Sequence, residues 1–425
     1  MASPGSVLIL DENLPVPFDR RVWLEARALR EAGYGVTVVC PQTEAYPAAH
    51  ERLEGIDILR HPLSLEADSA RGYLREYGAA LCWEARLVLF ADGRRAVDVV
   101  HICNPPDLLF LTGGLLKLLR GAALIFDQHD ISPELYETKY GKRDAFYRAL
   151  VLAERATYAA ADVVISTNET YRAIALGRGG KSPGDVFVVR NGPDLSRFVE
   201  TAPDSAYKRG KRYLVGYVGT MGEQEGIDHL LRVARAICVD GGHDDVGFCI
   251  IGGGPALGGL KRLSASMGLG GCVEFTGRVS DAQLLARLSS CDVCVNPDPK
   301  TPFNDASTMT KIMDYMALRK PVVQYDVVEG RRSAGEASLY ARGGDEADFA
   351  GKIVQLLDDP EARERMGALG SERMETALEW RLQIPNLFAA YDRAMEVARR
   401  RRARRAQVIA RIKKAGGLSD AGPVR

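Results

Sequence analysis

Short continuous apolar runs alternate along the chain with longer segments of helical periodicity. The first apolar run, Val7–Leu10, is followed by a helical pattern over Val22–Ala32 and by a second apolar run at Val36–Cys40. Buried strands that alternate with helices are typical of a parallel sheet covered on both faces. The same alternation predicts further strands at Ile56–Leu59, Val99–Cys103, Ala123–Phe126, Asp162–Ser166 and Val186–Val189.

The alternation restarts after a polar segment, Thr201–Lys211, which contains Pro203 and Gly210. This segment is typical of a linker, so we expect one α/β domain over residues 1–200 and a second over residues 212–379. Each is predicted to be a Rossmann-like, doubly wound domain whose ligand binds at the carboxyl ends of its strands. The strands predicted for the second domain are Tyr213–Val218, Val246–Ile251, Val273–Thr276, Val293–Asn296 and Pro321–Tyr325.

One stretch of the second domain, Asp305–Val323, has the pattern of a capped helix followed by a buried strand. Asp305 and Ser307 are good N-cap residues, and four apolar residues between Met309 and Met316 have the spacing of a helix face that packs on a core. An ordinary amphipathic helix would show the same pattern.

The polar residues of this stretch suit a nucleotide-sugar. Ser307, Lys311 and Asp314 fall on one face of the predicted helix. A helix N-terminus offers free N–H groups to phosphate, and Lys311 would add a positive charge one turn further on. Asp314 would add a carboxylate that can accept two hydrogen bonds from a vicinal diol.

Polar and glycine residues also gather after the other predicted strands, where ligands bind in this architecture. Backbone N–H groups of glycine loops can hold phosphate. Strand ends need turn residues in any case, and Gly252–Pro255 could be a plain turn. Together the clusters favour a cleft between two facing domains. They are Asp11–Arg21, Asn104–Asp107, Asp127–Asp130, Arg190–Asp194, Gly219–Gly222, Gly252–Pro255, Gly277–Arg278 and Asn296–Asp298.

Composition narrows the class of protein. The 425 residues, 46% hydrophobic and 26% charged, are typical of a globular protein. The eight cysteines are scattered among apolar stretches, which indicates reduced core residues, and the lone C-x-x-C of Cys291 and Cys294 does not predict zinc. We expect no signal peptide at the N-terminus and no membrane span in the interrupted apolar region Leu108–Phe126.

Although the net charge of the chain is zero, its C-terminal segment is strongly basic. Nine Arg and Lys residues and no acidic residue lie between Arg399 and Lys414. With Val408, Ile409 and Ile412, this segment suits a helix lying on an anionic membrane surface. A solvated tail is the alternative. We expect no nucleic-acid partner, because the strand ends lack an aromatic stacking platform.

Four motifs stand in order along the chain. They are F-D-Q-H-D-I-S-P-E (Phe126–Glu134), G-T-M-G-E-Q-E-G-I-D (Gly219–Asp228), N-P-D-P-K (Asn296–Lys300) and D-A-S-T-M-T-K-I-M-D-Y-M-A (Asp305–Ala317). With these motifs the chain resembles the retaining glycosyltransferases of family 4, and within them the WbuB-like O-antigen and capsule branch. The resemblance covers Val7 to about Tyr391. It implies the GT-B fold, with two facing Rossmann-like domains and a crossover helix over residues 380–398 that packs on the N-terminal domain. The basic tail covers residues 399–425.

The resemblance also implies an activity. A sugar, expected to be of the N-acetylhexosamine type, would pass from a UDP-sugar to an acceptor hydroxyl with retention at the anomeric carbon. The acceptor would be a sugar or a lipid-linked glycan of bacterial polysaccharide or glycolipid synthesis, met in the cytoplasm or at the inner face of the cell membrane. No cofactor and no metal are expected, and the sequence has no Asp-x-Asp at a strand end to hold a metal.

Two features of the family's donor site are altered here. The family's E-x7-E motif matches Ser307 and Asp314, of which Asp314 can still bind the ribose diol. The family's Arg and Lys after the first C-terminal strand match near Thr220 and Glu225, so that basic pair is missing. The diphosphate charge is therefore assigned to Lys311, Arg278 or Arg331. The donor-binding residues predicted in full are Gly219, Thr220, Met221, Gly222, Arg278, Asp305, Ser307, Thr308, Lys311, Asp314 and Arg331.

His129 matches a family histidine on the N-terminal side of the cleft. It lies between two aspartates at a strand end, which can orient its ring and hold its charge. We predict His129 and Asp130 as catalytic, with a structural turn histidine as the alternative, and His101 as a core residue. The predicted acceptor-side residues are Asp19, Arg20, Arg21, Asn104 and Asp107.

Other functions stay open at this point. A nucleotide-sugar 2-epimerase or an inverting transferase could use the same fold. A catalytically weak nucleotide-sugar-binding partner or scaffold subunit is favoured by the missing Glu and the missing basic pair.

Overall fold

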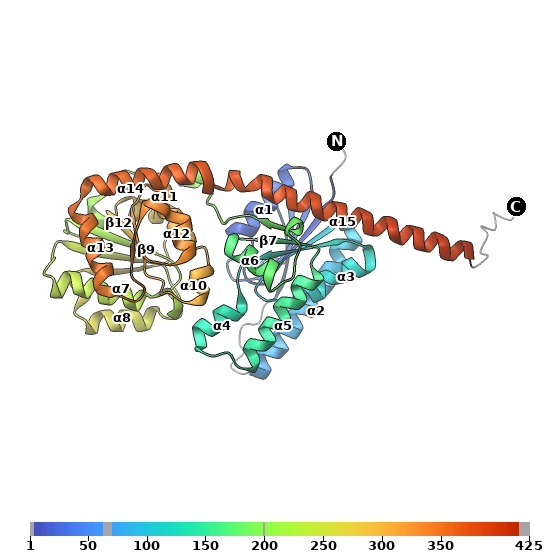
Figure 1. Ribbon diagram of the computed structural model, residues 1–425, viewed down its shortest axis with the longest axis horizontal. Coiled ribbons are helices and arrows are strands. Elements are labelled where there is room, and N and C mark those ends of the chain that lie inside the picture. Colours follow the sequence, from blue (N-terminus) through green and yellow to red (C-terminus); the bar gives the residue numbers. More distant parts are fainter. Residues whose placement is uncertain (1–3, 63–69, 199, 416–425) are drawn as a thin grey trace. The chain divides into compact units, whose positions relative to one another are not determined.

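The computed structural model describes residues 4–62, 70–198 and 200–415 (Figure 1). The chain divides into two compact units. Unit 1 consists of Met1–Pro133, Asp144–Val189 and Ile384–Arg425, and unit 2 of Glu134–Arg143 and Arg190–Gln383.

The sheet of unit 1 has the strand order β3-β4-β2-β1-β5-β6-β7-β8. All neighbouring strands are parallel except β3, which runs antiparallel to β4. Strand β1 pairs with β2 on one side and with β5 on the other, so the order reverses there. The strands are β1 Ser6–Asp11, β2 Gly35–Gln42, β3 His50–Leu53, β4 Ile56–Pro62, β5 Val99–Cys103, β6 Ala123–Gln128, β7 Val163–Ser166 and β8 Val186–Val188.

Helices cover this sheet because the apolar strands need cover on both faces (Figure 1). Leu8, Leu10 and Leu124 pack with Val88 of α2 and Leu116 of α3 in one buried cluster. The helices in this part of the chain are α1 Arg20–Glu31, α2 Ala70–Arg94, α3 Phe110–Arg120, α4 Ser132–Tyr140, α5 Ala145–Ala160 and α6 Glu169–Gly177.

The sheet of unit 2 is parallel, with the strand order β11-β10-β9-β12-β13-β14. The predicted linker lies inside this unit, where Lys208 forms an ion pair with Asp292 at 2.8 Å. The strands are β9 Tyr213–Val218, β10 Val246–Ile251, β11 Val273–Gly277, β12 Val293–Asn296, β13 Val322–Tyr325 and β14 Ser338–Ala341. The helices are α7 Ile227–Arg235, α8 Leu257–Ser266, α9 Asp281–Ser289, α10 Pro302–Ala306, α11 Thr310–Ala317, α12 Val328–Ala334, α13 Glu346–Asp358 and α14 Pro360–Arg373.

The helix predicted from Asp305 or Ser307 starts later than expected. Its backbone is extended at Ser307 (φ −92°, ψ 139°), so a short α10 ends before it and α11 begins at Thr310. The N-cap residue of α11 is Met309, which makes no side-chain cap bond. Asp305 instead accepts a hydrogen bond from the N–H of Val328 at the start of α12 (2.9 Å). The predicted core face of α11 is correct, because Ile312, Met313 and Met316 are buried.

The C-terminal helix α15, Trp380–Ala415, continues past residue 398 and contains Pro385 (Figure 1). Its part from Ile384 onward belongs to unit 1, where Leu387, Tyr391 and Ala398 are buried. In the described part of the chain no helix has the length and apolar character needed to cross a membrane.

Part of the basic run that was predicted to meet a membrane is used within unit 1. Arg401 pairs with Asp162 (2.6 Å) and donates to the carbonyl of Ala122 (2.6 Å). Arg402 pairs with Asp98, and Arg405 donates to the carbonyl of Leu118 (3.0 Å). Residues 416–425 of the predicted tail lie outside the described residues.

Candidate active site

The carboxyl edge of the unit 2 sheet is built from interlocked glycine loops. The N–H of Met221 donates to the carbonyl of Gly253 (3.0 Å), and the carbonyl of Met221 accepts from the N–H of Ala256 (3.0 Å). A Cβ atom at Gly252 would lie 2.0 Å from the carbonyl oxygen of Gly219, and Gly252 has a φ of +132°. Only glycine allows this approach, so the composition of these loops reflects close packing of backbones.

The predicted donor residues of these loops differ in their surroundings. Thr220 is exposed, whereas the side chain of Met221 is in the core and its backbone groups are bonded within the edge. Met221 therefore positions the loop. Arg278 follows β11 and lies over Gly253, whose added Cβ would be 3.4 Å from its Cγ. Among the described residues no carboxylate pairs with Arg278, so its charge is available to a ligand.

Lys311 of α11 lies in a buried group of charges that the local sequence pattern did not predict. Its Nζ donates to Glu225 (2.9 Å) and to both carboxylate oxygens of Asp298 (3.0 Å each). It also lies 5.1 Å from the ring centroid of Tyr217. Both carboxylates come from strand-end loops, one after β9 and the other after β12.

This pairing changes the charge that Lys311 offers to a ligand. Burial would lower the pKa of Lys311, but Asp298, then Tyr217 and Glu225, raise it well above its usual value. Burial raises the pKa of Asp298 to about 7, against the lowering effect of Lys311. Lys311 stays charged, yet Glu225 and, when it is ionised, Asp298 already compensate its charge, so it is not the free cation that the diphosphate assignment requires.

Asp314 and Tyr315 follow on the same helix. Asp314 is partly exposed, as a ligand-binding carboxylate must be. Tyr315 is fully buried, accepts from the N–H of Val218 at the end of β9 (2.9 Å) and donates to the carbonyl of Val295 on β12 (3.2 Å). Tyr315 therefore fixes α11 against the two strands that carry Glu225 and Asp298.

The remaining predicted donor residues lie around the start of α11 and on α12. Ser307 is buried and Thr308 partly exposed in the segment between α10 and α11. Arg331 pairs with Asp326 (2.8 Å), and its guanidinium carbon lies 3.9 Å from the ring centroid of Tyr340. The charge of Arg331 is thus already paired, although 53% of its side chain is exposed.

In unit 1, buried charged groups surround Asp127 at the end of β6. Arg21 makes a bidentate pair with Asp127 (2.8 and 2.7 Å) and also donates to the carbonyl of Val189 (2.9 Å). Burial would raise the pKa of Asp127, but Arg21 and then His129 lower it well below its usual value. Arg21, predicted on the acceptor side, therefore holds Asp127 as a carboxylate.

His129 also binds this carboxylate, with its Nε2 2.6 Å from Oδ2 of Asp127. Burial would lower the pKa of His129, but Asp127 raises it to about 9. At neutral pH the ring is an imidazolium whose 15% exposed side chain can donate a hydrogen bond. It is therefore a cationic donor rather than a general base.

Asn104 holds the loop that carries His129 and Asp130. Its Oδ1 accepts from the N–H groups of His129 (2.8 Å) and Asp130 (3.2 Å), and its Nδ2 donates to Asp107 (2.8 Å). Asn104 is 2% exposed and Asp107 5% exposed, so both act through the loop they support.

His101 is buried, as predicted for a core residue, and it connects this site to the C-terminal helix. Its Nδ1 lies 2.7 Å from Oη of Tyr391 on α15, and its Nε2 lies 3.5 Å from Asp127. Nε2 also lies 3.6 Å from Glu25, and burial raises the pKa of Glu25 to about 7. The local pattern around Tyr391 gave no indication of this contact.

Asp19 and Arg20 lie at the start of α1. Asp19 is its N-cap residue and accepts from the N–H of Val22 (2.9 Å), which is a structural role. Arg20 is exposed. The nearby Asp11 is buried, and burial, then the charge of Asp19, raise its pKa to about 8.

Two buried groups of unit 1 bring metal-ligating atoms within 4.8 Å of one another. In the first, His101, Cys103 and Asp127, burial keeps the pKa of the thiol well above its usual value, and Asp127 is already bound by Arg21. That group suits hydrogen bonding better than a cation. The second group is Glu12, His61 and Glu84, where burial and then Glu12 hold the pKa of Glu84 well above its usual value. In this group Nε2 of His61 already lies 2.7 Å from Glu12.

Residues of both units match family models of glycosyl transferases. Residues 19–192 match the glycosyl transferase 4-like domain, and residues 212–359 match the glycosyl transferases group 1. The chain is 29% identical over 340 residues to a D-inositol 3-phosphate glycosyltransferase of Thermomonospora curvata. The matched region covers 73% of this chain and 77% of that protein.

Solved structures show the same fold. Sucrose-phosphate synthase from Thermosynechococcus elongatus matches with a TM-score of 0.76 and 18% identity, over 91% of this chain and 98% of its own. The Anabaena protein Alr3699/HepE, in complex with UDP-glucose, matches with a TM-score of 0.70 and 16% identity, over 91% of this chain and 99% of its own. At these identities the likeness concerns the fold alone.

Proposed function

We propose that this chain transfers a sugar from a UDP-sugar to an acceptor hydroxyl with retention at the anomeric carbon. The chain belongs to the group 1 glycosyltransferases of family 4 and has the GT-B fold. The observation that carries the proposal is the carboxyl edge of unit 2. There Arg278 lies over the tightly packed glycine loops and pairs with no carboxylate among the described residues, and Asp314 of α11 is partly exposed. A carboxylate suits a ribose diol, and a guanidinium suits a diphosphate.

The leaving diphosphate gains charge during transfer, so the site needs cations and N–H dipoles that are already in place. We assign the direct cationic contact to Arg278, because Lys311 and Arg331 are paired with carboxylates. Lys311 then acts by fixing Glu225 and Asp298 around α11. In this proposal the diphosphate is held without a metal ion.

In unit 1 we assign His129 the role of a cationic hydrogen-bond donor to the donor sugar or the acceptor. Asp127 keeps the ring charged, and Asn104 fixes its backbone. Asp130 stays a proposed catalytic neighbour on the same loop. A carboxylate nucleophile is not required, since retention can arise when the acceptor attacks from the face of the leaving group.

The finer assignments are also proposals. The motif resemblance to the O-antigen and capsule branch favours an N-acetylhexosamine donor and a lipid-linked glycan acceptor at a membrane surface. The relative from Thermomonospora curvata is named for D-inositol 3-phosphate, which favours a phosphorylated cyclitol as the acceptor instead. That the Anabaena structure contains UDP-glucose supports uridine as the nucleotide.

The test is a matrix of donors and acceptors. UDP-GlcNAc, UDP-GalNAc and UDP-glucose would each be offered with a polyprenyl-diphosphate-linked sugar and with D-inositol 3-phosphate, and the product would be analysed by NMR. We expect one pair to give a glycoside with the anomeric configuration of the donor. An inverted product or a 2-epimerised sugar would contradict retaining transfer. UDP binding without turnover of any pair would favour the scaffold subunit.

A further inference from the structure

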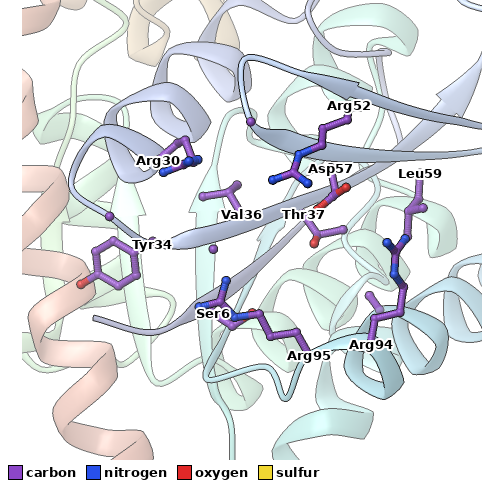
Figure 2. Close-up of a pocket in the computed structure, with 14 residues that line it drawn as sticks. Ser6, Arg30, Tyr34, Val36, Thr37, Arg52, Asp57, Leu59, Arg94 and Arg95 are labelled. Atoms are coloured by element: carbon purple, nitrogen blue, oxygen red, sulfur yellow. The ribbon is translucent and has the colours of Figure 1, made fainter. Parts of the chain in front are cut away.

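A pocket of about 310 Å³ lies in unit 1 at the edge of the sheet opposite to Asp127 and His129. Its lining includes Ser6 and Gly35, the first residues of the parallel strands β1 and β2, whereas Asp127 lies near the end of β6. Figure 2 shows that arginine side chains reach this pocket from several elements. The pocket is therefore separate from the residues assigned to sugar transfer.

Four arginines line the pocket: Arg30 of α1, Arg52 of β3, Arg94 at the end of α2, and the adjacent Arg95. Within the described residues, Arg30, Arg52 and Arg94 form no ion pair with a carboxylate. One acidic residue, Asp57, is in the lining, and its Oδ1 lies 3.6 Å from Nε2 of His50. Three guanidinium groups without a carboxylate partner among the described residues, against one carboxylate in the lining, leave the pocket positive.

The backbone makes room for two of these guanidinium groups. A Cβ atom at Gly35 would lie 1.8 Å from Nη1 of Arg95, and one at Gly55 would lie 2.8 Å from Nε of Arg30. Arginines near helix C-termini can simply complement the helix dipoles, which would account for Arg30 and Arg94. That explanation does not apply to Arg52, which comes from a strand and faces the same pocket (Figure 2).

We propose that this pocket binds a phosphate-bearing anion. The planar guanidinium group matches phosphate oxygens in a bidentate geometry, and several like charges gathered together need a ligand with more than one negative charge. The volume is at the lower end of the range for small-molecule sites, which suits a phosphate or diphosphate group rather than a whole nucleotide-sugar.

The phosphate could belong to a soluble phosphate ester or to the headgroup of a lipid. Phe90 is 52% exposed, and the guanidinium carbon of Arg94 lies 5.8 Å from the centroid of its ring. An exposed aromatic residue beside the pocket is compatible with either source, so the experiment has one arm for each.

The first arm measures binding of inorganic pyrophosphate to the full chain by calorimetry, with UDP in excess so that the donor site is occupied. The pocket variant is Arg52→Ala with Arg94→Ala. The matched control is Arg148→Ala with Arg155→Ala, which removes the same charge from exposed positions of α5. We expect affinity to fall at least about tenfold in the pocket variant, because charge-assisted contacts are lost, and to stay unchanged in the control.

The second arm measures flotation with phosphatidylglycerol vesicles and with phosphatidylcholine vesicles. Loss of phosphatidylglycerol binding in the pocket variant alone identifies a lipid headgroup. Unchanged vesicle binding, with loss of pyrophosphate binding, identifies a soluble phosphate. The proposal is wrong if the pocket variant and the control behave alike in both arms, or if the wild-type chain binds neither probe. Thermal unfolding of both variants checks that they fold.

Discussion

The Nε2 atom of His129 lies 2.6 Å from the Oδ2 atom of Asp127, whose two carboxylate oxygens also accept hydrogen bonds from Nε and Nη2 of Arg21. A fully buried carboxylate with two cationic partners keeps its charge, and it therefore keeps the imidazole protonated at neutral pH. The site in unit 1 thus offers a positive hydrogen-bond donor, which limits the steps in which His129 can take part.

The first prediction concerns His129. We expect His129→Ala to lower kcat at least about tenfold and to leave UDP affinity nearly unchanged, because the residue is not part of the nucleotide edge. His229→Ala is the matched control, since His229 of α7 contacts Glu346 (2.8 Å) and has no assigned chemistry. Steady-state kinetics and calorimetry test this, and wild-type turnover of His129→Ala would remove His129 from the mechanism.

The second prediction concerns pH. The pKa of His129 is raised from 6.5 to about 9, so the folded state favours the protonated ring. Its contribution to stability is fully present below about pH 6.5 and is lost as pH rises through about 9. We expect kcat to fall over the same alkaline limb. An alkaline limb of the same size in His129→Ala would show that another group titrates.

The third prediction concerns Asp314. Loss of hydrogen bonds to a charged group costs about 1.5–3 kcal/mol, so Asp314→Ala should weaken UDP binding by that amount. Asp358→Ala, at an exposed position at the end of α13, removes the same charge away from the edge and should have no effect. Unchanged UDP affinity of Asp314→Ala by calorimetry would exclude Asp314 from the donor site.

The fourth prediction separates Arg278 from Lys311. Arg278→Ala should weaken binding of UDP much more than binding of uridine, because its charge is assigned to the diphosphate.

Lys311→Met should destabilise the fold by about 3–5 kcal/mol, since it leaves two carboxylates without their cation. Chemical denaturation measures this loss, and adding Asp298→Asn should recover much of it. If Lys311→Met instead keeps full stability and loses affinity for UDP alone, Lys311 is itself the diphosphate ligand.

The fifth prediction concerns the C-terminal segment. Arg401 and Arg402 are bonded within unit 1, so a truncation should retain them and begin at Ala406. We expect deletion of residues 406–425 to weaken binding to anionic vesicles, because it removes Val408, Ile409 and Ile412 together with basic residues. UDP binding should be unchanged. Equal vesicle binding by both chains would show that the segment is merely solvated.

The sequence determined the framework of this protein. Largely apolar runs such as those of β1, β5 and β10 have few alternatives to buried strands, and all three were predicted nearly to the residue. Strand β3 was not predicted, because His50–Leu53 is largely polar and alternates between exposed and partly buried positions. The clusters of polar and glycine residues that follow the strands were also predicted from the sequence, since the order of strands and helices alone places them at the carboxyl edges of the sheets.

Only the tertiary structure decided which charges at those edges are free. The local sequence around Lys311 predicts an available cation, but its partner Glu225 is 86 residues away in the chain. The basic run predicts a membrane-binding segment, but Arg401 pairs with Asp162, which is 239 residues away in the chain. Local periodicity sets which residues form strands and helices. The pairing of charges depends on which distant loops packing brings together, and short-range patterns carry no information about that.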